Sequence, residues 1–278
     1  GYSKFKPQKI NQIETFTPDK NILTLYNKVL LYIMSISAKL DRLHRNAKGN
    51  KWLRRFSVFI RIALAAGFLP SGFVKIMGER FTSLSVNHPM GHYLEALHLT
   101  GYYYPFIGIM QVTAAILLLI PRTAVLGAVI YFPIILNICI LSFAVRFDGS
   151  LLSSPLMVLA DLYLLCWHYD KLKFILPFGQ AAGTTGTPAP MVISNKFPTA
   201  FFAGVAATVI VLVLIIVNVF DIKPHNTFSD CKQQCGSKSN PAACNVFCEC
   251  IHIKGQPLDK CLDDYHKALK AAARATSH

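Results

Sequence analysis

Long apolar runs constrain this chain more than any other feature of its sequence. Five such runs are Phe56–Met77, Tyr102–Ile120, Thr123–Val145, Leu151–Tyr169 and Ala200–Phe220. A helix that crosses a hydrocarbon core of about 30 Å needs roughly 20 mostly apolar residues. Just over half of the 278 residues are apolar, and they lie in runs rather than in alternating periods. We therefore predict an all-α membrane protein with five spans.

The basic residues lie next to the apolar runs. Residues 1–55 carry twelve Lys and Arg against three acids, whereas the loops 78–101 and 146–154 hold one base each. The positive-inside rule places the N-terminus on the inner side of the membrane, so five spans place the C-terminus outside. Proteins that read bases concentrate their charge on one folded face, so we expect no nucleic-acid partner.

Six of the eight cysteines follow the last apolar run. Cys231 and Cys235 are four residues apart, as are Cys244 and Cys248, so each pair shares one face of a helix. A turn at 240–241 separates them and predicts a helical hairpin. Antiparallel packing predicts two disulfides, Cys231–Cys248 and Cys235–Cys244. The two remaining cysteines can form a third, Cys250–Cys261. This pairing is one of fifteen that six cysteines allow.

Two chemistries suit such a cluster of sulfurs. Four thiolates can bind tetrahedral zinc, but an oxidising outer side favours disulfides, and we predict no metal. The paired C-x-x-x-C spacing from Cys231 to Cys248 resembles the twin C-x-x-x-C proteins of the mitochondrial intermembrane space. That resemblance implies an inner mitochondrial membrane, with the N-terminus in the matrix. The alternative is a bacterial plasma membrane with a periplasmic C-terminus.

A second resemblance covers residues 56–175. In "IRIALAAGFLPSGFVKIMG" (Ile60–Gly78) and "IGIMQVTAAILLLIPRTAVLGAVI" (Ile107–Ile130) the chain resembles the DoxX-like membrane proteins. The resemblance implies a four-helix bundle, and its namesakes are tied to thiosulfate:quinone oxidoreductase. Where that family often has an acid in the second span, this chain has Gln111, which weakens a catalytic interpretation.

Ionisable residues inside a bilayer are candidates for function. Asp161 lies in mid-span and Arg61 lies inside the first span, so we predict an ion pair across the bundle. Such a pair could line a cavity for a quinone or for proton transfer, or could simply fix the register of the helices. Gln111, Asn137 and His92 are further candidates for polar, quinone or lipid contacts. His88 precedes a proline, so we expect it to cap a helix rather than bind a metal.

The composition divides the chain into five parts. They are a basic arm with an interfacial amphipathic helix at Asn21–Leu40 (1–55), the four-span bundle (56–175), a Gly/Pro-rich linker (176–198), a fifth transmembrane helix (199–220) and a cysteine-rich tail (221–278). Whether Asn21–Leu40 lies on the membrane or spans it is left open. A helix that begins near Pro257 could be a docking face or could pack on the hairpin.

We predict a non-catalytic accessory subunit of a respiratory-chain complex, because the arm and the tail resemble docking extensions. Its expected partners are other subunits and lipids, with cardiolipin at the basic inner side. No cofactor is expected apart from bound phospholipid, although the bundle could hold a quinone. The alternatives are a quinone-linked redox subunit of a bacterial plasma membrane and, with weaker support, a small-solute transporter.

Overall fold

The computed structural model describes residues 28, 39–172, 193–238 and 240–275. Most of the interfacial helix expected at Asn21–Leu40 and most of the linker at 176–198 lie outside these residues. Within the described part of the chain the secondary structure is helical, with one isolated bridge between Asn50 and Ser194. The prediction of an all-α fold is therefore confirmed.

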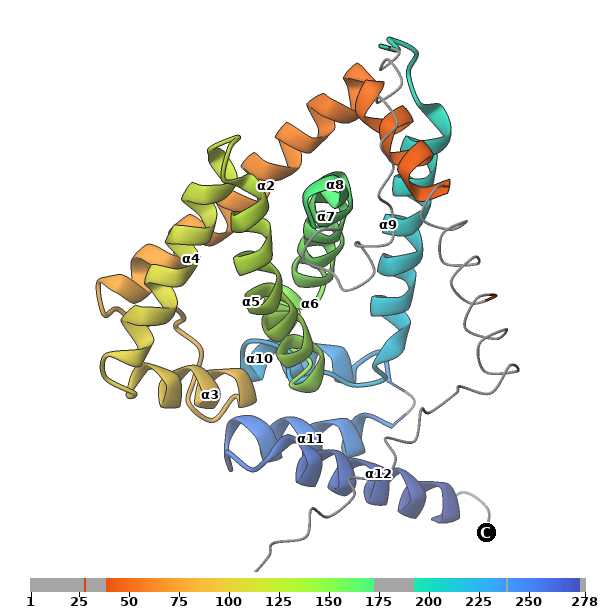
Figure 1. The fold of residues 1–278 in the computed structure, drawn as a ribbon. Helices are drawn as coiled ribbons and strands as arrows, with labels where there is room; N and C mark the ends of the chain where they lie inside the picture. Colours follow the sequence, from red (N-terminus) through yellow and green to blue (C-terminus); the bar gives the residue numbers. More distant parts are fainter. Residues whose placement is uncertain (1–27, 29–38, 173–192, 239, 276–278) are drawn as a thin grey trace, which may run out of the picture.

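Four helices form a bundle at the centre of the molecule (Figure 1). They are α2 (Lys51–Ile76), α4 (Tyr103–Leu119), α5 (Ala124–Ala144) and α7 (Ser153–Trp167). Helix α2 contacts both α4 and α7, and α5 contacts the same two helices, so the four close into a ring. The short turn at Pro121 makes α4 and α5 an antiparallel hairpin, as the sequence predicts.

Small residues let the helices of the bundle approach closely. Ala114 and Ala115 on α4 are fully buried. A side chain at Gly127 on α5 would meet the backbone of α4, because an ideal Cβ there lies 2.6 Å from the amide nitrogen of Leu118. Small residues at helix contacts are typical of membrane bundles. The α4–α5 packing therefore depends on the missing side chain at position 127.

Among the described residues, four helical segments are long and apolar enough to cross a membrane. They are α2, α5, α9 (Thr199–Val219) and residues Asp148–Trp167, which join the short α6 (Asp148–Leu151) to α7. Helix α4 qualifies only together with α3 (Pro89–His98), and a bend of 99° separates the two. At 1.5 Å per residue, the 17 residues of α4 reach about 25 Å. The described part of the chain thus contains four candidate spans, or five when the bent pair is counted as one.

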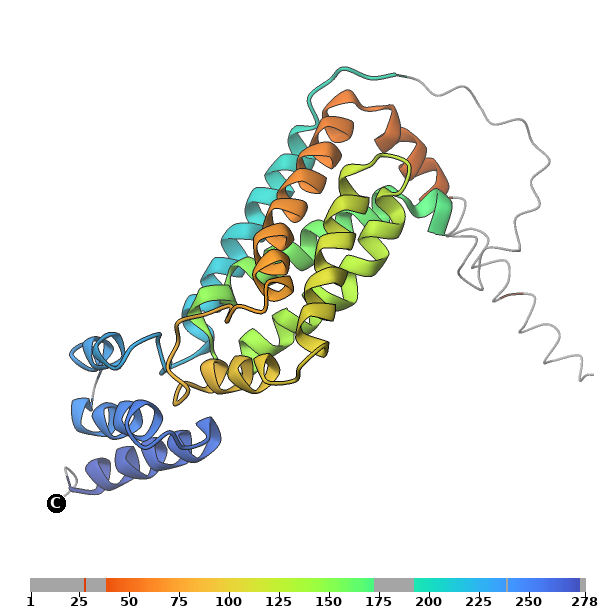
Figure 2. The same ribbon diagram turned by 90° about the vertical axis from the view of Figure 1, so that its left-hand side faces the viewer.

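The two ends of the bundle differ (Figure 2). Helices α2 and α9 begin at one end, where the short α8 (Tyr169–Leu172) also lies. At the other end lie α3 and the cysteine-rich tail, which forms α10 (Phe228–Cys235), α11 (Pro241–His252) and α12 (Leu258–Ala275). We call the first the basic end and the second the cysteine end.

Candidate functional site

The cysteine-rich tail is built from helices with clear local signals. Helix α10 begins after Thr227, whose Oγ1 accepts a hydrogen bond from the Asp230 amide at 3.1 Å. Helix α11 begins after Asn240, whose Oδ1 accepts from the Ala243 amide at 3.0 Å, with Pro241 at the first helical position. Side-chain caps of this kind satisfy amides that have no intrahelical partner. The turn expected at 240–241 is therefore also a helix start.

Three disulfides hold these helices together, in the pairs expected from an antiparallel hairpin. Cys231–Cys248 and Cys235–Cys244 join α10 to α11, and Cys250–Cys261 joins α11 to α12. Cys235, Cys244 and Cys248 lie close enough to share a metal, but in this structure their sulfurs are bonded in pairs. Each crosslink restricts the unfolded chain and stabilises a segment that is too short for a large core.

Helix α12 turns its apolar side onto α11. Cys261 and Tyr265 are buried there against Phe247 and Ile251. The Tyr265 hydroxyl donates to Oδ2 of Asp221 at 2.8 Å, and this hydrogen bond is the main cause that lowers the pKa of Asp221. Burial and the same contact raise the pKa of Tyr265 to about 12. The helix therefore packs on the hairpin, and the docking face expected of it stays a prediction.

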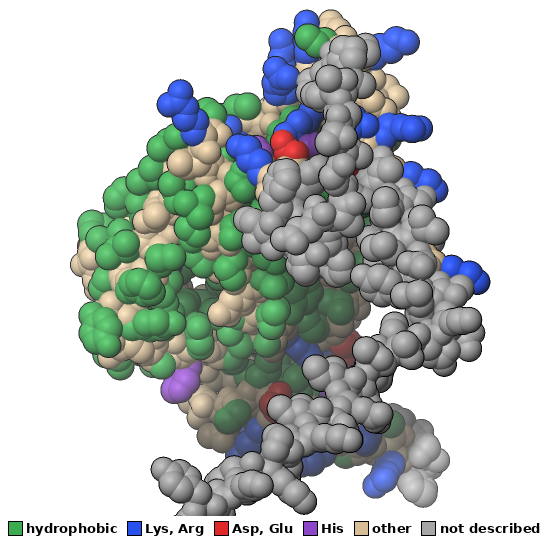
Figure 3. Space-filling model, viewed as in Figure 1, with side chains coloured by type: hydrophobic (Ala, Val, Ile, Leu, Met, Phe, Trp, Pro, Cys, Tyr) green, Lys and Arg blue, Asp and Glu red, His purple; other side chains and the backbone are tan. Residues whose placement is uncertain are grey.

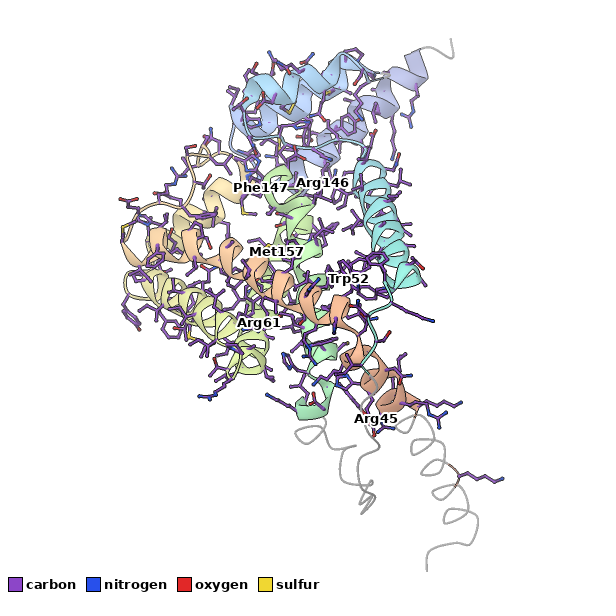
Figure 4. The ribbon with its side chains drawn as sticks, turned by 90° about the horizontal axis from the view of Figure 1, so that it is seen from above. Arg45, Trp52, Arg61, Arg146, Phe147 and Met157 are labelled. Carbon is purple, nitrogen blue, oxygen red and sulfur yellow. A yellow bond between two sulfur atoms is a disulfide. The ribbon has the colours of Figure 1, made fainter. Side chains whose placement is uncertain are left out.

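The tail is fastened to the bundle through the loop between α5 and α6. Arg146 donates from Nη1 to the carbonyl oxygen of Ile222 at 2.8 Å, and its guanidinium lies 4.7 Å from the ring centre of Phe220. Figure 4 shows Arg146 and Phe147 at the boundary between the bundle and the tail. The backbone of Arg146 has a positive φ of 55°, which is uncommon for a residue with a side chain. The loop is thus held in an unusual conformation where the tail binds it.

An acid in the same loop pairs with two bases of the tail. Oδ2 of Asp148 lies 2.6 Å from Nδ1 of His225, and its Oδ1 lies 3.5 Å from Nζ of Lys223. All three side chains are partly buried, at 20–29% exposure. Partial burial reduces screening by solvent, so this cluster contributes more than an exposed surface pair does.

The loop before α3 makes the third contact with the tail. Nδ2 of Asn87 donates to the carbonyl oxygen of His252 at 2.8 Å. Gly255 follows with a φ of +58°, and an ideal Cβ there would lie 2.8 Å from Oδ1 of Asn87. Glycine suits position 255, because another residue would adopt this φ only at a cost and its Cβ would displace the Asn87 side chain. We call the contacts of residues 87, 146 and 148 with the tail the tail seat.

His88 lies fully buried beside the tail seat. Its Nδ1 accepts a hydrogen bond from the Met90 amide at 3.1 Å, so it caps α3 as the sequence predicts. Its ring centre is 6.0 Å from that of His252. Burial, and secondarily the nearby His252, lower the pKa of His88 to about 4. The imidazole is therefore neutral at physiological pH, as an acceptor at a helix start must be.

The ion pair predicted between Arg61 and Asp161 is not formed. Arg61 donates instead to the backbone carbonyl oxygens of Leu118 at 2.5 Å and Leu119 at 2.7 Å. The last carbonyls of a helix have no intrahelical donor, so the end of α4 offers ready acceptors. Asp161 is fully buried, and neither carboxylate oxygen has a hydrogen-bond partner among the described residues.

The three candidates for quinone or lipid contacts face different surroundings. Gln111 is buried on α4, and its Oε1 has no hydrogen-bond partner among the described residues. Asn137 lies on the exposed side of α5. His92 is exposed on α3. These residues therefore do not combine into one polar pocket.

Sequence reasoning also missed two features of the bundle. Lys75 is buried rather than directed outward: its Nζ donates to the Ser71 carbonyl at 3.1 Å and lies 4.3 Å from the ring centre of Phe81. Cys166 is exposed. The position of Lys75 near a helix end does not by itself reveal which way the side chain turns.

A cavity of about 680 Å³ lies between α2, α7 and α9. Its walls include Phe59, Ala63, Met157 and Gly204, and apolar groups dominate the remainder. Two hydroxyls reach the lining, but Thr208 donates to the Gly204 carbonyl on its own helix and Tyr163 donates to that of Leu53 on α2. Among the described lining residues, the cavity thus offers hydrocarbon contacts and no uncommitted hydroxyl proton.

The comparisons with known proteins give one relative. Over 126 residues the chain is 37% identical to the protein YwoB of Bacillus subtilis (strain 168), which is described as uncharacterized. The match covers 43% of this chain and 80% of YwoB. The chain belongs to the same family as YwoB. No family model matches the chain, and no solved structure matches it.

Membership of the YwoB family connects the chain to a bacterial protein without stating an activity. Because the match covers 43% of the chain, more than half of the chain lies outside the part shared with YwoB. More than half of the chain is therefore available for features that YwoB does not share.

Proposed function

We propose that the protein is a non-catalytic accessory subunit of a respiratory-chain complex in the inner mitochondrial membrane. In this proposal the bundle anchors the subunit in the bilayer, and the disulfide-linked tail presents a docking surface in the intermembrane space. The observation that carries the proposal is the tail seat, which fixes a covalently closed three-helix unit at one end of the bundle. A firmly held unit of this kind suits permanent contact with a neighbouring subunit.

The two ends of the molecule support the proposed orientation. The disulfides lie at the cysteine end and require an oxidising compartment. Lys48 and Lys51 lie at the opposite end, as does Arg122 in the α4–α5 turn. Positive charge is retained on the inner side of a membrane. Both signals support the proposed orientation, in which the basic end faces the matrix and the cysteine end lies outside it.

The polar groups in the bundle favour an accessory role over catalysis. Arg61 is bonded to backbone carbonyls, and the other candidates on α3, α4 and α5 do not gather into one site. General acid–base chemistry needs groups within hydrogen-bond reach of a common substrate position. The described part of the bundle lacks such a grouping of these residues.

A second candidate function is a quinone-linked redox subunit in a bacterial plasma membrane. The observation that favours it is that two buried groups, the Asp161 carboxylate and Oε1 of Gln111, have no hydrogen-bond partner among the described residues, since such groups often mark intramembrane function. The relationship to YwoB is compatible with a bacterial origin. The resemblance to the DoxX-like proteins supports the same alternative.

Purification of the full chain from its native membrane in mild detergent separates the two functions. An accessory subunit is recovered at a fixed ratio with respiratory subunits, and Asp161→Asn leaves the turnover of the complex unchanged. A double variant, Asn87→Ala with Arg146→Gln, loosens the tail seat and lowers that recovery. Asp264→Asn on α12 is the matched control for a surface change. Recovery of the chain alone, with quinol oxidation that depends on Asp161, would contradict the proposal.

A further inference from the structure

Helix α9, which forms one wall of the cavity between α2, α7 and α9, is tied to the rest of the molecule at both ends. At the basic end, Asn50 Nδ2 donates to the Lys196 carbonyl at 2.9 Å, and the ring centres of Trp52 and Phe197 lie 5.3 Å apart. At the cysteine end, the chain after α9 is held by Arg146 through the Ile222 carbonyl. Between these ties α9 contacts the bundle through Phe201, whose ring centre lies 5.6 Å from that of Phe56 and 5.7 Å from that of Tyr163, and Ile216 is the one buried residue of α9.

The walls of this cavity favour a hydrocarbon ligand over a polar one. A void in an apolar region loses dispersion contacts along its whole lining, so a filled cavity is more stable. Its volume of about 680 Å³ lies within the range of roughly 300–1,000 Å³ that is typical of ligand sites. The hydroxyls of Tyr163 and Thr208 already donate elsewhere. A ligand with a polar group inside the cavity would leave that group without a donor.

The cavity occupies the half of the bundle next to the basic end. On α2 it is lined from Phe56 to Leu64, and on α9 from Ala200 to Val209. Residues one helical turn apart lie on the same face of a helix. Arg55 therefore lies one turn before the lining residue Phe59, and Trp52 one turn before Phe56. Figure 4 shows Trp52 on the side of α2 that faces α9 and Met157 between the helices.

Three cations lie near the basic end of the cavity. Lys51, Arg55 and Lys196 are all exposed, and among the described residues none of the three pairs with a carboxylate. Arg55 lies over Trp52, with its guanidinium carbon 5.5 Å from the ring centre. Figure 3 shows Lys and Arg side chains at this end, beyond the apolar belt. Tryptophan and basic residues are the usual anchors at the level of lipid head groups.

We propose that this cavity binds one acyl chain of an anionic phospholipid, whose phosphate is held by Arg55, Lys51 and Lys196. The apolar walls contact the acyl chain, and the cations without a carboxylate partner bind the phosphate of the head group. An anionic lipid matches both features, whereas a zwitterionic lipid places a second positive charge beside the cluster. The bound lipid fills the space between α9 and the bundle and so links α9 to the bundle.

Quenching of tryptophan fluorescence tests the proposal on the full chain in nanodiscs. The chain has two tryptophans, and a Trp167→Phe background leaves Trp52 as the reporter. Phosphatidylglycerol brominated on its acyl chains is titrated against brominated phosphatidylcholine. We expect phosphatidylglycerol to bind tighter by roughly fivefold for each cation engaged, since one basic residue near an anionic surface contributes about 1 kcal/mol. Equal quenching by the two lipids would overturn the proposal.

Variants separate the head-group site from the cavity. Arg55→Gln with Lys196→Gln reduces the preference for phosphatidylglycerol, whereas Arg54→Gln is the matched control, because it changes an exposed neighbouring arginine on a different face of α2. Gly204→Leu fills the cavity, since an ideal Cβ there meets no atom within 4 Å. We expect this variant to abolish tight lipid retention in native mass spectrometry while its helicity stays unchanged.

Two outcomes would reject the proposed occupant. If Gly204→Leu retains as much phosphatidylglycerol as the unchanged chain, the lipid binds outside the cavity. If ubiquinone displaces brominated phosphatidylglycerol in direct competition, the cavity holds an isoprenoid tail instead. Either result leaves the proposed accessory role intact, because that role is judged by recovery with partner subunits.

Discussion

Nδ1 of His225 in the tail lies 2.6 Å from Oδ2 of Asp148 at the start of α6. Residues 77 positions apart in sequence are thus joined where the last transmembrane helix gives way to the disulfide-linked tail. His225 adopts a positive φ of 53°, so the chain turns sharply at this contact. The pair fixes the direction in which the tail leaves α9, and with it the surface that the tail presents.

Asp148→Asn should loosen the tail from the bundle. The change removes the negative charge that pairs with His225 and Lys223, and a hydrogen bond to a charged group contributes about 1.5–3 kcal/mol. We expect faster amide hydrogen exchange over residues 220–228, with the disulfides intact. Asp264→Asn is the control, because its pairing with Lys267 is at the surface and contributes little. Unchanged exchange in the Asp148 variant would show that the pair does not hold the tail.

Acidification should weaken the packing around His88. The folded pKa is about 4 against 6.5 for an ordinary histidine, so the unfolded state binds more protons between these values. Stability is therefore fully present above about pH 6.5 and falls as the pH drops toward 4, by at most about 3 kcal/mol. Amide exchange of α3, measured across this range, reports the loss.

The matched variant for this pH response is His88→Asn. Asparagine is a good N-cap, so α3 keeps its start while the titrating ring is removed. We expect the acid sensitivity of α3 to decrease in this variant, with His252, His225 and Asp148 still present nearby. His92→Gln, which changes an exposed residue of the same helix, should leave the sensitivity as it was. A full pH response in His88→Asn would assign it to another group.

Loss of the disulfide between Cys250 and Cys261 should destabilise the tail. Removing a crosslink that spans 11 residues is expected to cost about 3 kcal/mol through the entropy of the unfolded chain. The double change to serine is compared with Cys139→Ser, which alters a cysteine outside the disulfides. Denaturant unfolding, followed by hydrogen exchange in α12, should show the difference. Equal stability in both variants would mean that packing alone holds α12.

A double-mutant cycle of Arg61→Gln and Asp161→Asn should give a coupling energy below about 0.5 kcal/mol. Groups without a direct contact or shared partner have additive effects. Arg61 is bonded to the end of α4, so changing Asp161 does not alter its contacts. Thermal unfolding in detergent measures all four species. A coupling of 1–3 kcal/mol would show that the ion pair forms after all.

Gly127→Ala should destabilise the bundle by roughly 1–3 kcal/mol, because the added methyl group meets the backbone of α4 and forces the helices apart. Gly204→Ala is the matched control on α9. Its methyl group meets open space, so stability should stay constant or rise by up to about 1 kcal/mol through the lower entropy of the unfolded chain. Thermal unfolding of both variants checks the difference.

Much of the architecture could be predicted because its signals are local. A membrane helix satisfies its own backbone hydrogen bonds, so an apolar run predicts a span without knowledge of its neighbours. His88 and Asn240 cap the helices they precede. The i, i+4 spacing of Cys231 and Cys235 and of the second pair predicted which sulfurs could meet, and the structure brings them together.

The errors concern which helix faces which. Arg61 and Asp161 were matched by charge, but the rotation of α2 directs the arginine to Leu118 and Leu119, where the end of α4 leaves carbonyl oxygens without donors. The contact between Asn87 and His252 also depends on the packing of the helices, because 165 residues separate the two in sequence. Sequence alone thus determined the helices, their caps and the spacing of the sulfurs, because these depend on neighbours along the chain. Only the tertiary structure decided the partners of the buried charges and the seat of the tail, because these depend on how the helices are rotated and packed.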